Sequence, residues 1–176
     1  VTAELEMAEP GKFAATNPEI YGQGSFSKKA DCNGYEVIVD TKGTLLWPDA
    51  ADMEKPYLIL TGENVTKEYL DYLDGQHISW IACGKKNVDL VRAVEILSEQ
   101  FHVERMGIVG GPKINTAFLK AGLLDEISIL IGAGIDGRGG MPAVFDGLEM
   151  SHDVTALKLT DVQKFDSGAV WIRYAV

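Results

Sequence analysis

Short apolar runs alternate with helix-patterned segments along the middle of this chain, and this alternation restricts the fold more than any other feature. The runs are rich in β-branched and aromatic residues, which predicts strands over residues 35–40, 57–61, 78–82, 106–109 and 126–131. Because these runs are apolar nearly throughout, we expect both faces of each strand to be buried. Buried strands that alternate with helices pair in parallel, so the pattern predicts an α/β fold with a mostly parallel central sheet flanked by helices.

Three helices fit the intervals between these strands. Thr66 can cap a helix that Gly75 ends, and Asn87 can cap a longer one. Pro112 suits the first turn of a third helix, and Gly122 suits its end. The first two helices present apolar faces at helical spacing, formed by Tyr69, Leu70 and Leu73 and by Leu90, Val94, Leu97 and Phe101.

The two ends of the chain depart from this pattern. Residues 155–164 and 169–176 predict strands on either side of a turn at residues 165–168, so we expect a C-terminal antiparallel β-hairpin. At the other end, a short helix from about Glu19 towards Asp31 is indicated, although two glycines within it weaken it. The sequence shows no linker or internal repeat, so residues 1–176 are expected to form a single domain.

Composition limits the class of partner. With 176 residues and 46% hydrophobic composition, the chain can bury the core of one domain. Its net charge of −10 argues against nucleic-acid binding, because neutralising phosphates needs clustered Lys and Arg. No apolar run is long enough to span a membrane, no secretory signal pattern opens the chain, and no His, Cys and carboxylate cluster has metal-ligand spacing. We therefore expect a cytoplasmic protein that needs no metal and keeps Cys32 and Cys83 reduced.

Two adjacent glycines, Gly110 and Gly111, stand between the strand predicted at 106–109 and the helix predicted from Pro112. The first turn of a helix has unpaired N–H groups and partial positive charge, and glycine lets an anion approach them. The glycine pair therefore predicts a site for a phosphate or pyrophosphate, and a nucleotide cofactor is the first hypothesis. A tight strand-to-helix turn without a ligand explains the same residues equally well.

Two common nucleotide motifs do not fit this pair. A Rossmann fingerprint has spaced glycines and an acidic residue about 20 positions later, whereas these glycines are adjacent and Asp125 and Glu126 begin a strand. A P-loop fails as well, because residues 84–86 lack the Ser or Thr and the glycine spacing.

The order of the elements gives a second argument for a ligand site. Parallel strands gather their carboxyl ends at one edge of the sheet, where ligands bind in open α/β folds. Thr41, Thr61 and Gly84 each lie at or just after such an end, and Gly110 follows a fourth predicted strand. We therefore expect these four residues to line one rim.

The residues around the glycine pair form a wider pattern. It comprises residues 78–81, 83–84, 89–97, 108–115, 117–119 and 122–126, and the glycine-rich stretch 132–140 with Pro142, Val144 and Phe145. In these residues the chain resembles the reductase domain of riboflavin biosynthesis, a member of the dihydrofolate-reductase-like superfamily. The resemblance extends over roughly residues 35–176 and implies the three-layer fold of that superfamily.

This resemblance implies an NADPH-dependent reductase of a small-molecule substrate. In the family the glycine pair lies against the cofactor pyrophosphate, and the turn after an earlier strand meets the adenosine end. The implied pyrophosphate-binding residues are Gly110, Gly111, Pro112, Lys113 and Ile114. The implied adenosine-side residues are Asp40, Thr41, Lys42, Thr61 and Gly84.

Lys42 offers a positive charge to a 2′-phosphate, and Thr41 offers a hydroxyl group. A solvated turn lysine explains Lys42 nearly as well, and a turn-capping role is the simpler interpretation of Asp40. No residue is assigned as the catalytic acid; Glu19 and Tyr21 are weak candidates from the segment that resembles the substrate side of the family.

The chain departs from the family in three places. Val109 stands where many members carry Glu, which leaves the substrate open. The given sequence starts at Val1 without the family's opening strand and its Asp-Gly-Lys-like motif. A Gly-Arg-x-Thr-like motif is also absent, so we expect residues to be missing between Asp31 and Tyr35.

The leading hypothesis is a riboflavin-precursor reductase, acting on 5-amino-6-ribosylaminouracil phosphate. Dihydrofolate reduction is the nearest alternative, and a non-catalytic nucleotide-binding or dimerisation module is an alternative of another class. The family often pairs, and the final strand has an apolar edge at Trp171, Ile172 and Tyr174, which indicates a homodimer, although a core role explains these side chains better.

Overall fold

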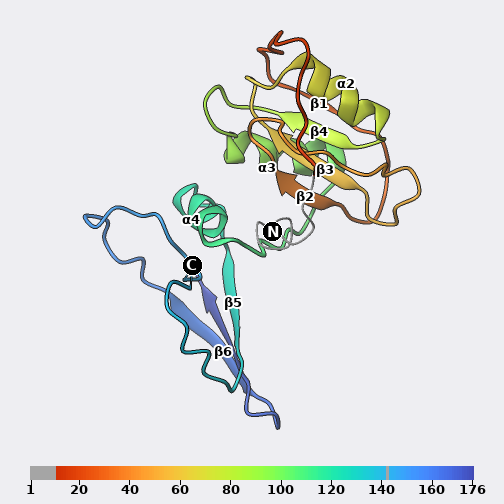
Figure 1. Ribbon diagram of the computed structural model, residues 1–176. Helices are drawn as coiled ribbons and strands as arrows, with labels where there is room; N and C mark the ends of the chain where they lie inside the picture. The colour runs from red at the N-terminus through yellow and green to blue at the C-terminus, as the bar shows by residue number, and fades with distance from the viewer. Residues whose placement is uncertain (1–10, 142) are drawn as a thin grey trace. The chain divides into compact units, whose positions relative to one another are not determined.

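The computed structural model describes residues 11–141 and 143–176 (Figure 1). By its contacts the chain divides into two compact units, Val1–Gly107 and Ile108–Val176. The first contains a largely parallel sheet and the second an antiparallel one. None of the helices in the described residues has the length and hydropathy to cross a membrane.

The sheet of the first unit has the strand order β1-β4-β3-β2. Strands β2 (Glu36–Val39), β3 (Tyr57–Thr61) and β4 (Ser79–Ala82) pair in parallel, which confirms the pairing predicted from their apolar sequences. Strand β1 (Ser25–Ser27) lies antiparallel to β4 at one edge.

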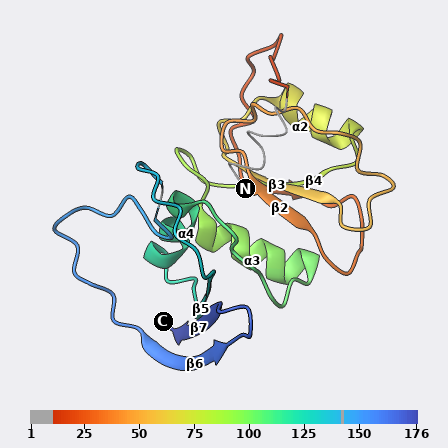
Figure 2. The ribbon, with the colours of Figure 1, turned by 60° about the horizontal axis from the view of Figure 1, so that its bottom comes forward.

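Helices α2 (Lys67–Gly75) and α3 (Leu90–Phe101) cover opposite faces of this sheet (Figure 2). Successive side chains of a strand point to opposite faces. On β3, Ile59 therefore packs in the α2-side core, whereas Leu58 and Leu60 pack in the α3-side core; none of the three is more than 1% exposed. The predicted three layers are confirmed.

The helix ends follow the sequence only in part. Thr66 caps α2 as predicted, accepting a hydrogen bond from the Tyr69 N–H (3.3 Å). Gly75 is the last residue of α2, as predicted, and the left-handed residue beyond this end is His77, at φ 56°. The predicted cap at Asn87 is wrong: Asp89 caps α3 and accepts from the Arg92 N–H (3.0 Å).

The buried face of α3 is also displaced from the predicted one. Leu97 and Phe101 are buried as predicted, whereas Leu90 and Val94 are only half-buried. Ala93 and Ile96 complete the buried face instead.

The predicted helix between Glu19 and Asp31 is wrong. The segment contains β1, and the chain before β1 is not helical; we call residues 16–24 the N-terminal strap. The strap runs along the loop after β3: the Tyr21 N–H donates to the Val65 carbonyl (2.8 Å) and the Gly22 N–H to the Glu63 carbonyl (2.8 Å). These tertiary hydrogen bonds take the place of helical ones, and Gly22, at φ 73°, adopts a left-handed conformation that favours glycine.

Glu68, in the first turn of α2, fastens the beginning of the strap. Its carboxylate accepts hydrogen bonds from the Thr16 N–H (2.7 Å), the Thr16 hydroxyl (2.9 Å) and the Asn17 N–H (2.7 Å). The bond from the Asn17 N–H, followed by that from the Thr16 hydroxyl, lowers the pKa of Glu68 below its ordinary value.

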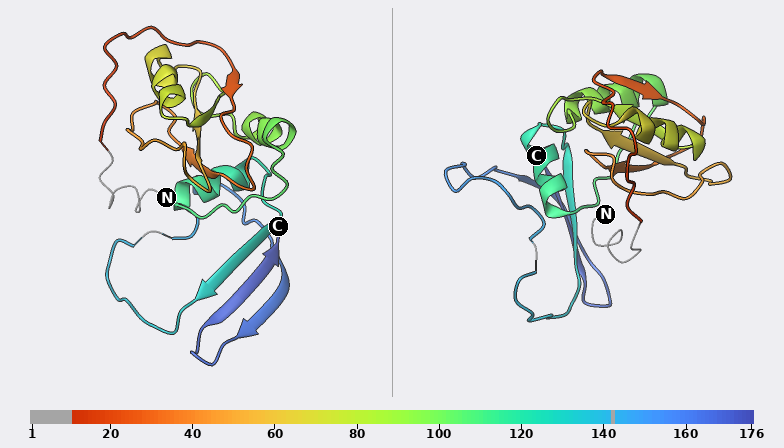
Figure 3. Two further views of the ribbon diagram at one scale, coloured as in Figure 1. Left: turned by 90° about the vertical axis from the view of Figure 1, so that its right-hand side faces the viewer. Right: turned by 45° about the horizontal axis from the view of Figure 1, so that its top comes forward.

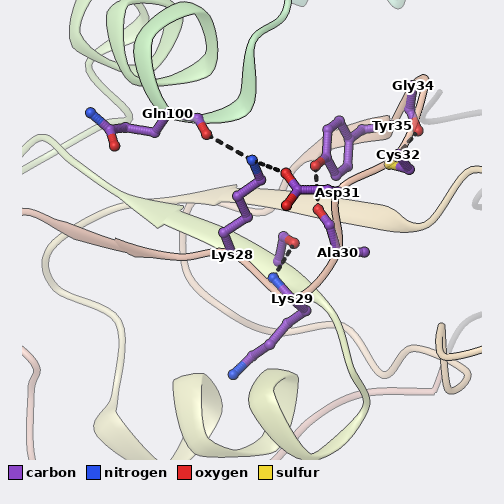
Figure 4. A network of polar contacts seen from close by, with 9 residues as sticks. Lys28, Lys29, Ala30, Asp31, Cys32, Gly34, Tyr35 and Gln100 are labelled. Carbon is purple, nitrogen blue, oxygen red and sulfur yellow. Dashed lines mark hydrogen bonds and ion pairs between the residues drawn. The ribbon is translucent and has the colours of Figure 1, made fainter.

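The link from β1 to β2, residues 28–35, is fastened to the same unit (Figure 4). Lys28 donates to the Gln100 carbonyl (3.0 Å) at the end of α3 and pairs with Asp31, whose pKa it lowers. The Tyr35 hydroxyl donates to the Ala30 carbonyl (2.5 Å). The expectation that residues are missing between Asp31 and Tyr35 stays a prediction.

The second unit contains α4 (Pro112–Lys120) and the strands β5 (Glu126–Ile131), β6 (Lys158–Lys164) and β7 (Val170–Ala175), in the order β5-β7-β6 (Figure 3). The hairpin of β6 and β7 is confirmed, as are both predicted ends of α4: Pro112 begins it and Gly122 follows it at φ 67°.

Strand β5 pairs antiparallel with β7, so the parallel pairing predicted for it is wrong. Burial alternates over its first four residues: Glu126 and Ser128 are exposed, whereas Ile127 is buried and Ile129 is half-buried. This alternation is typical of an antiparallel sheet with two unlike faces.

Residues 106–109 do not form the predicted strand. Met106 packs against the α3-side core, whereas Val109 is 81% exposed. Gly107 weakens the run, and no neighbouring strand of the described residues pairs with it. The division between the two units falls within it.

We expect Glu68→Gln to destabilise the first unit at neutral pH, because it removes the carboxylate that holds the strap. The lowered pKa means that this stabilisation is complete above the unfolded value of 4.5 and is lost as the pH falls through the lower folded value. Urea unfolding at pH 7 and pH 3 should therefore give a difference between wild type and variant that shrinks at pH 3. Glu104→Gln, at an exposed carboxylate, controls for the change in charge; an equal difference at both pH values would contradict the role of Glu68.

Candidate functional site

Three loops meet at the carboxyl ends of β2, β3 and β4, and we call them the rim: residues 40–45, 61–64 and 83–85. The Gly62 N–H donates to the Thr41 carbonyl (3.1 Å), and the Glu63 N–H donates to the Gly84 carbonyl (3.0 Å). The structure thus brings Thr41, Thr61 and Gly84 together, as expected from the parallel strand order.

Thr61 has a structural position on the rim. Its side chain is fully buried, and its hydroxyl donates to the Thr41 carbonyl (3.4 Å). Thr41 is half-buried and Lys42 is exposed. Of these three side chains, that of Lys42 is the most open to a ligand.

Asp40 has the turn-capping role that the sequence favoured for it. Its carboxylate accepts hydrogen bonds from the Thr44 N–H (2.7 Å), the Leu45 N–H (3.0 Å) and the Tyr69 hydroxyl (3.0 Å). Asp40 is only 6% exposed and Tyr69 is fully buried. Burial, together with the negative charge of Asp40, raises the pKa of Tyr69 above its ordinary value, so the phenol remains protonated and donates.

A pocket of about 600 Å³ opens beside the third loop of the rim. The strap and β1 line it with Gly24 and Phe26, and the rim and α3 add charged side chains at Glu63, Lys85 and Arg92. Glu63 also accepts a hydrogen bond from the Gly84 N–H (3.1 Å). Sequence reasoning missed these charged residues, since none belongs to a spaced motif and the strap had been predicted as a helix.

Cys83 lies in the wall of this pocket as a buried free thiol. Burial raises its pKa to about 11, so it is protonated and unreactive near neutral pH. Cys32 is also a free thiol.

Gly84 is required by the loop that contains it. It adopts φ 88°, and a Cβ atom at this position would lie 2.1 Å from the Asn87 carbonyl oxygen and 2.6 Å from the Asp89 nitrogen. The loop therefore folds tightly over Gly84 before α3 begins, which also explains why the cap is Asp89 and not Asn87.

The glycine pair lies in the second unit, at the start of α4. Gly110 adopts φ 122°, which favours glycine, and apart from its chain neighbours no atom of the described residues lies within 4 Å of the place where its Cβ would be. The Gly110–Gly111 peptide bond is cis. Gly111 is the N-cap residue, and within the described part of the chain the first N–H groups of α4 have no side-chain cap. Open backbone and uncapped amides form a set of donors that fits an anion.

Beside the glycine pair, two side chains of α4 fasten the loop before β6. The Asn115 side-chain amide donates to the Val144 carbonyl (2.8 Å), and the Thr116 hydroxyl accepts from the Asp146 N–H (2.9 Å). The Oδ1 atom of Asn115 is buried and has no hydrogen-bond partner in the described residues. Lys113 is exposed and Ile114 half-buried, and Pro142 lies outside the described residues.

A largely parallel sheet between helices, followed by an antiparallel hairpin, defines an α/β protein of the dihydrofolate-reductase-like class. Within that class, the chain belongs to the RibD C-terminal domain family, whose model matches residues 10–171. The resemblance to the reductase domain of riboflavin biosynthesis is therefore confirmed.

Solved structures agree on the fold. A pyrimidine reductase-like protein from Corynebacterium diphtheriae is 18% identical with a TM-score of 0.64, and the match covers 80% of this chain and 60% of that one. Two crystal forms of RibD from Acinetobacter baumannii are 23% and 24% identical with TM-scores of 0.56 and 0.54. Each match covers 79% of this chain and 36% of RibD, so the chain spans little more than a third of that protein.

We expect Gly84→Ala to destabilise the first unit by roughly 2 kcal/mol or more, because the methyl group would meet backbone atoms in a left-handed conformation. Gly75→Ala is the matched control: Gly75 lies at the end of α2, where a Cβ atom would meet no atom of residues 11–141 or 143–176 within 4 Å. It should be neutral or stabilising by up to about 1 kcal/mol. Urea unfolding measures both variants, and equal effects would contradict the tight loop over Gly84.

Proposed function

We propose that residues 1–176 act as a single reductase domain that uses NADPH to reduce a small heterocyclic substrate of the riboflavin-precursor type, 5-amino-6-ribosylaminouracil phosphate. The observation that carries this proposal is the open, uncapped start of α4 at Gly110 and Gly111 in a chain of the RibD C-terminal domain family. A homodimer in the cytoplasm is part of the same proposal.

The pyrophosphate of the cofactor would bind at the start of α4. Pro112 has no N–H group, so the donors would be the backbone amides of Gly111, Lys113 and Ile114. The exposed ammonium group of Lys113 adds positive charge beside them. Gly110 contributes space, since nothing in the described chain occupies the place of a side chain there.

The adenosine end would bind at the rim, where Lys42 supplies a positive charge for the 2′-phosphate and Thr41 lies beside it. Thr61, Asp40 and Gly84 support this surface from within: their contacts fix the loops that Thr41 and Lys42 belong to or touch. This division of roles fits a cofactor with a 2′-phosphate.

The bound cofactor would supply the hydride, and the chain would orient the substrate and exclude water. Glu19 and Tyr21 already have structural partners: Glu19 pairs with Lys67 (2.5 Å), and Tyr21 packs edge-on against Trp80 at 5.9 Å between ring centroids. Neither is therefore assigned as the acid. Val109, at the position where many members carry Glu, keeps dihydrofolate as a second candidate substrate.

Titration with NADPH and NADH, followed by an oxidation assay, tests the proposal. We expect saturable NADPH binding and turnover with the riboflavin precursor. Turnover with dihydrofolate alone would support the second candidate. Tight binding without turnover on either substrate would indicate a non-catalytic nucleotide-binding module, and no saturable binding of either nucleotide would overturn the proposal.

Replacing Gly111 with Asp tests the pyrophosphate site directly. Its φ of −77° suits any residue, and Asp is a good helix N-cap, so the fold should be retained. The added negative charge should repel the pyrophosphate. Gly111→Asn is the matched control, because it is a similar cap without the charge. We expect Asp to weaken NADPH binding at least about tenfold more than Asn does; equal affinities in both variants and wild type would show that the glycine pair is only a turn.

A further inference from the structure

The turn that carries Lys42 is shaped by a side chain of α2. The Tyr69 hydroxyl donates to Asp40 Oδ2 (3.0 Å) and accepts from Trp47 Nε1 (2.9 Å). Asp40 Oδ2 also accepts from the Thr44 and Leu45 N–H groups at 2.7 and 3.0 Å. A buried phenol thus holds the carboxylate that closes the turn.

The ring of Tyr69 supports the same turn by direct contact. Gly43 adopts φ 63°, and a Cβ atom there would lie 2.4 Å from Tyr69 Cδ1. The Gly43 N–H donates to the Asp40 carbonyl (3.2 Å), which closes the turn around residues 41 and 42. The backbone at Gly43 therefore packs against the ring of Tyr69, and the hydroxyl of the same tyrosine holds the Asp40 carboxylate.

The far side of the turn is fixed as well. The Thr41 carbonyl accepts hydrogen bonds from the Gly62 N–H and the Thr61 hydroxyl. Lys42 is thus an exposed, flexible side chain on a backbone that is held on both sides. Because the backbone is already held in one conformation, less conformational entropy is lost when a ligand binds.

We propose that Tyr69, acting through Asp40, is a positioning residue that sets the preference of the rim for a 2′-phosphorylated nucleotide. This inference rests on the proposed function, in which Lys42 meets the 2′-phosphate. NADH lacks that phosphate, so the position of Lys42 matters to NADPH and not to NADH. Loss of the Tyr69 hydroxyl loosens the turn and selectively weakens NADPH binding.

The test compares dissociation constants for NADPH and NADH in wild type and Tyr69→Phe. We expect the NADPH constant to rise about three- to fivefold, the scale of one exposed ion pair, and the NADH constant to stay unchanged. General destabilisation would change both constants equally. Trp47→Phe is the matched control, because it removes the other hydrogen bond of the same hydroxyl and leaves the bond to Asp40. The ratio of its NADPH and NADH dissociation constants should equal that of the wild type.

Hydrogen exchange of the Thr44 and Leu45 amides gives a second readout without any ligand, and should be faster in Tyr69→Phe than in Trp47→Phe. If Tyr69→Phe does not fold, Asp40→Asn takes its place, and we expect the same selective rise of the NADPH dissociation constant. If the wild type prefers NADPH and Tyr69→Phe has the same ratio of NADPH and NADH dissociation constants, this inference alone is overturned. A wild-type protein that binds neither nucleotide overturns the proposed function and this inference together.

Discussion

Parallel pairing of β2, β3 and β4 is the constraint on which the rest of the first unit depends. Strands buried on both faces need a helix on each side, and α2 and α3 meet that need. Parallel strands also bring their carboxyl ends to one edge. Backbone hydrogen bonds from Gly62 to Thr41 and from Glu63 to Gly84 then join the three loops into one rim.

Buried polar side chains of this rim form hydrogen bonds to its backbone, while a charged side chain of the same rim is exposed. The side chains of Thr61 and Asp40 point inward and form hydrogen bonds with backbone groups, whereas the side chain of Lys42 is exposed to solvent. In the second unit the start of α4 offers backbone donors without a side-chain cap. In the function proposed above, these backbone donors and the exposed charge of Lys42 would bind a cofactor that carries its own chemistry.

The sequence predicted the features that depend on residues close to one another in the chain. These are the strands β2 to β4, the Thr66 cap, the start of α4 at Pro112 and the final hairpin. The strap was not predicted, since its partners, such as Glu68 for Thr16, are far along the chain. The cap at Asp89 depended on the tight loop over Gly84, and the direction of β5 depended on β7. Of the predicted site residues, the gathering of Thr41, Thr61 and Gly84 followed from strand order, but only the structure shows that Thr61 and Asp40 face inward.

The most direct test of the central claim follows the backbone amides by NMR while nucleotide is added. With NADPH, the account predicts shifts of the Gly111, Lys113 and Ile114 amides and of the Thr41 and Lys42 amides. With NADH, the first group should shift and the second should move far less. NADPH binding that leaves the Gly111, Lys113 and Ile114 amides unshifted would contradict the account.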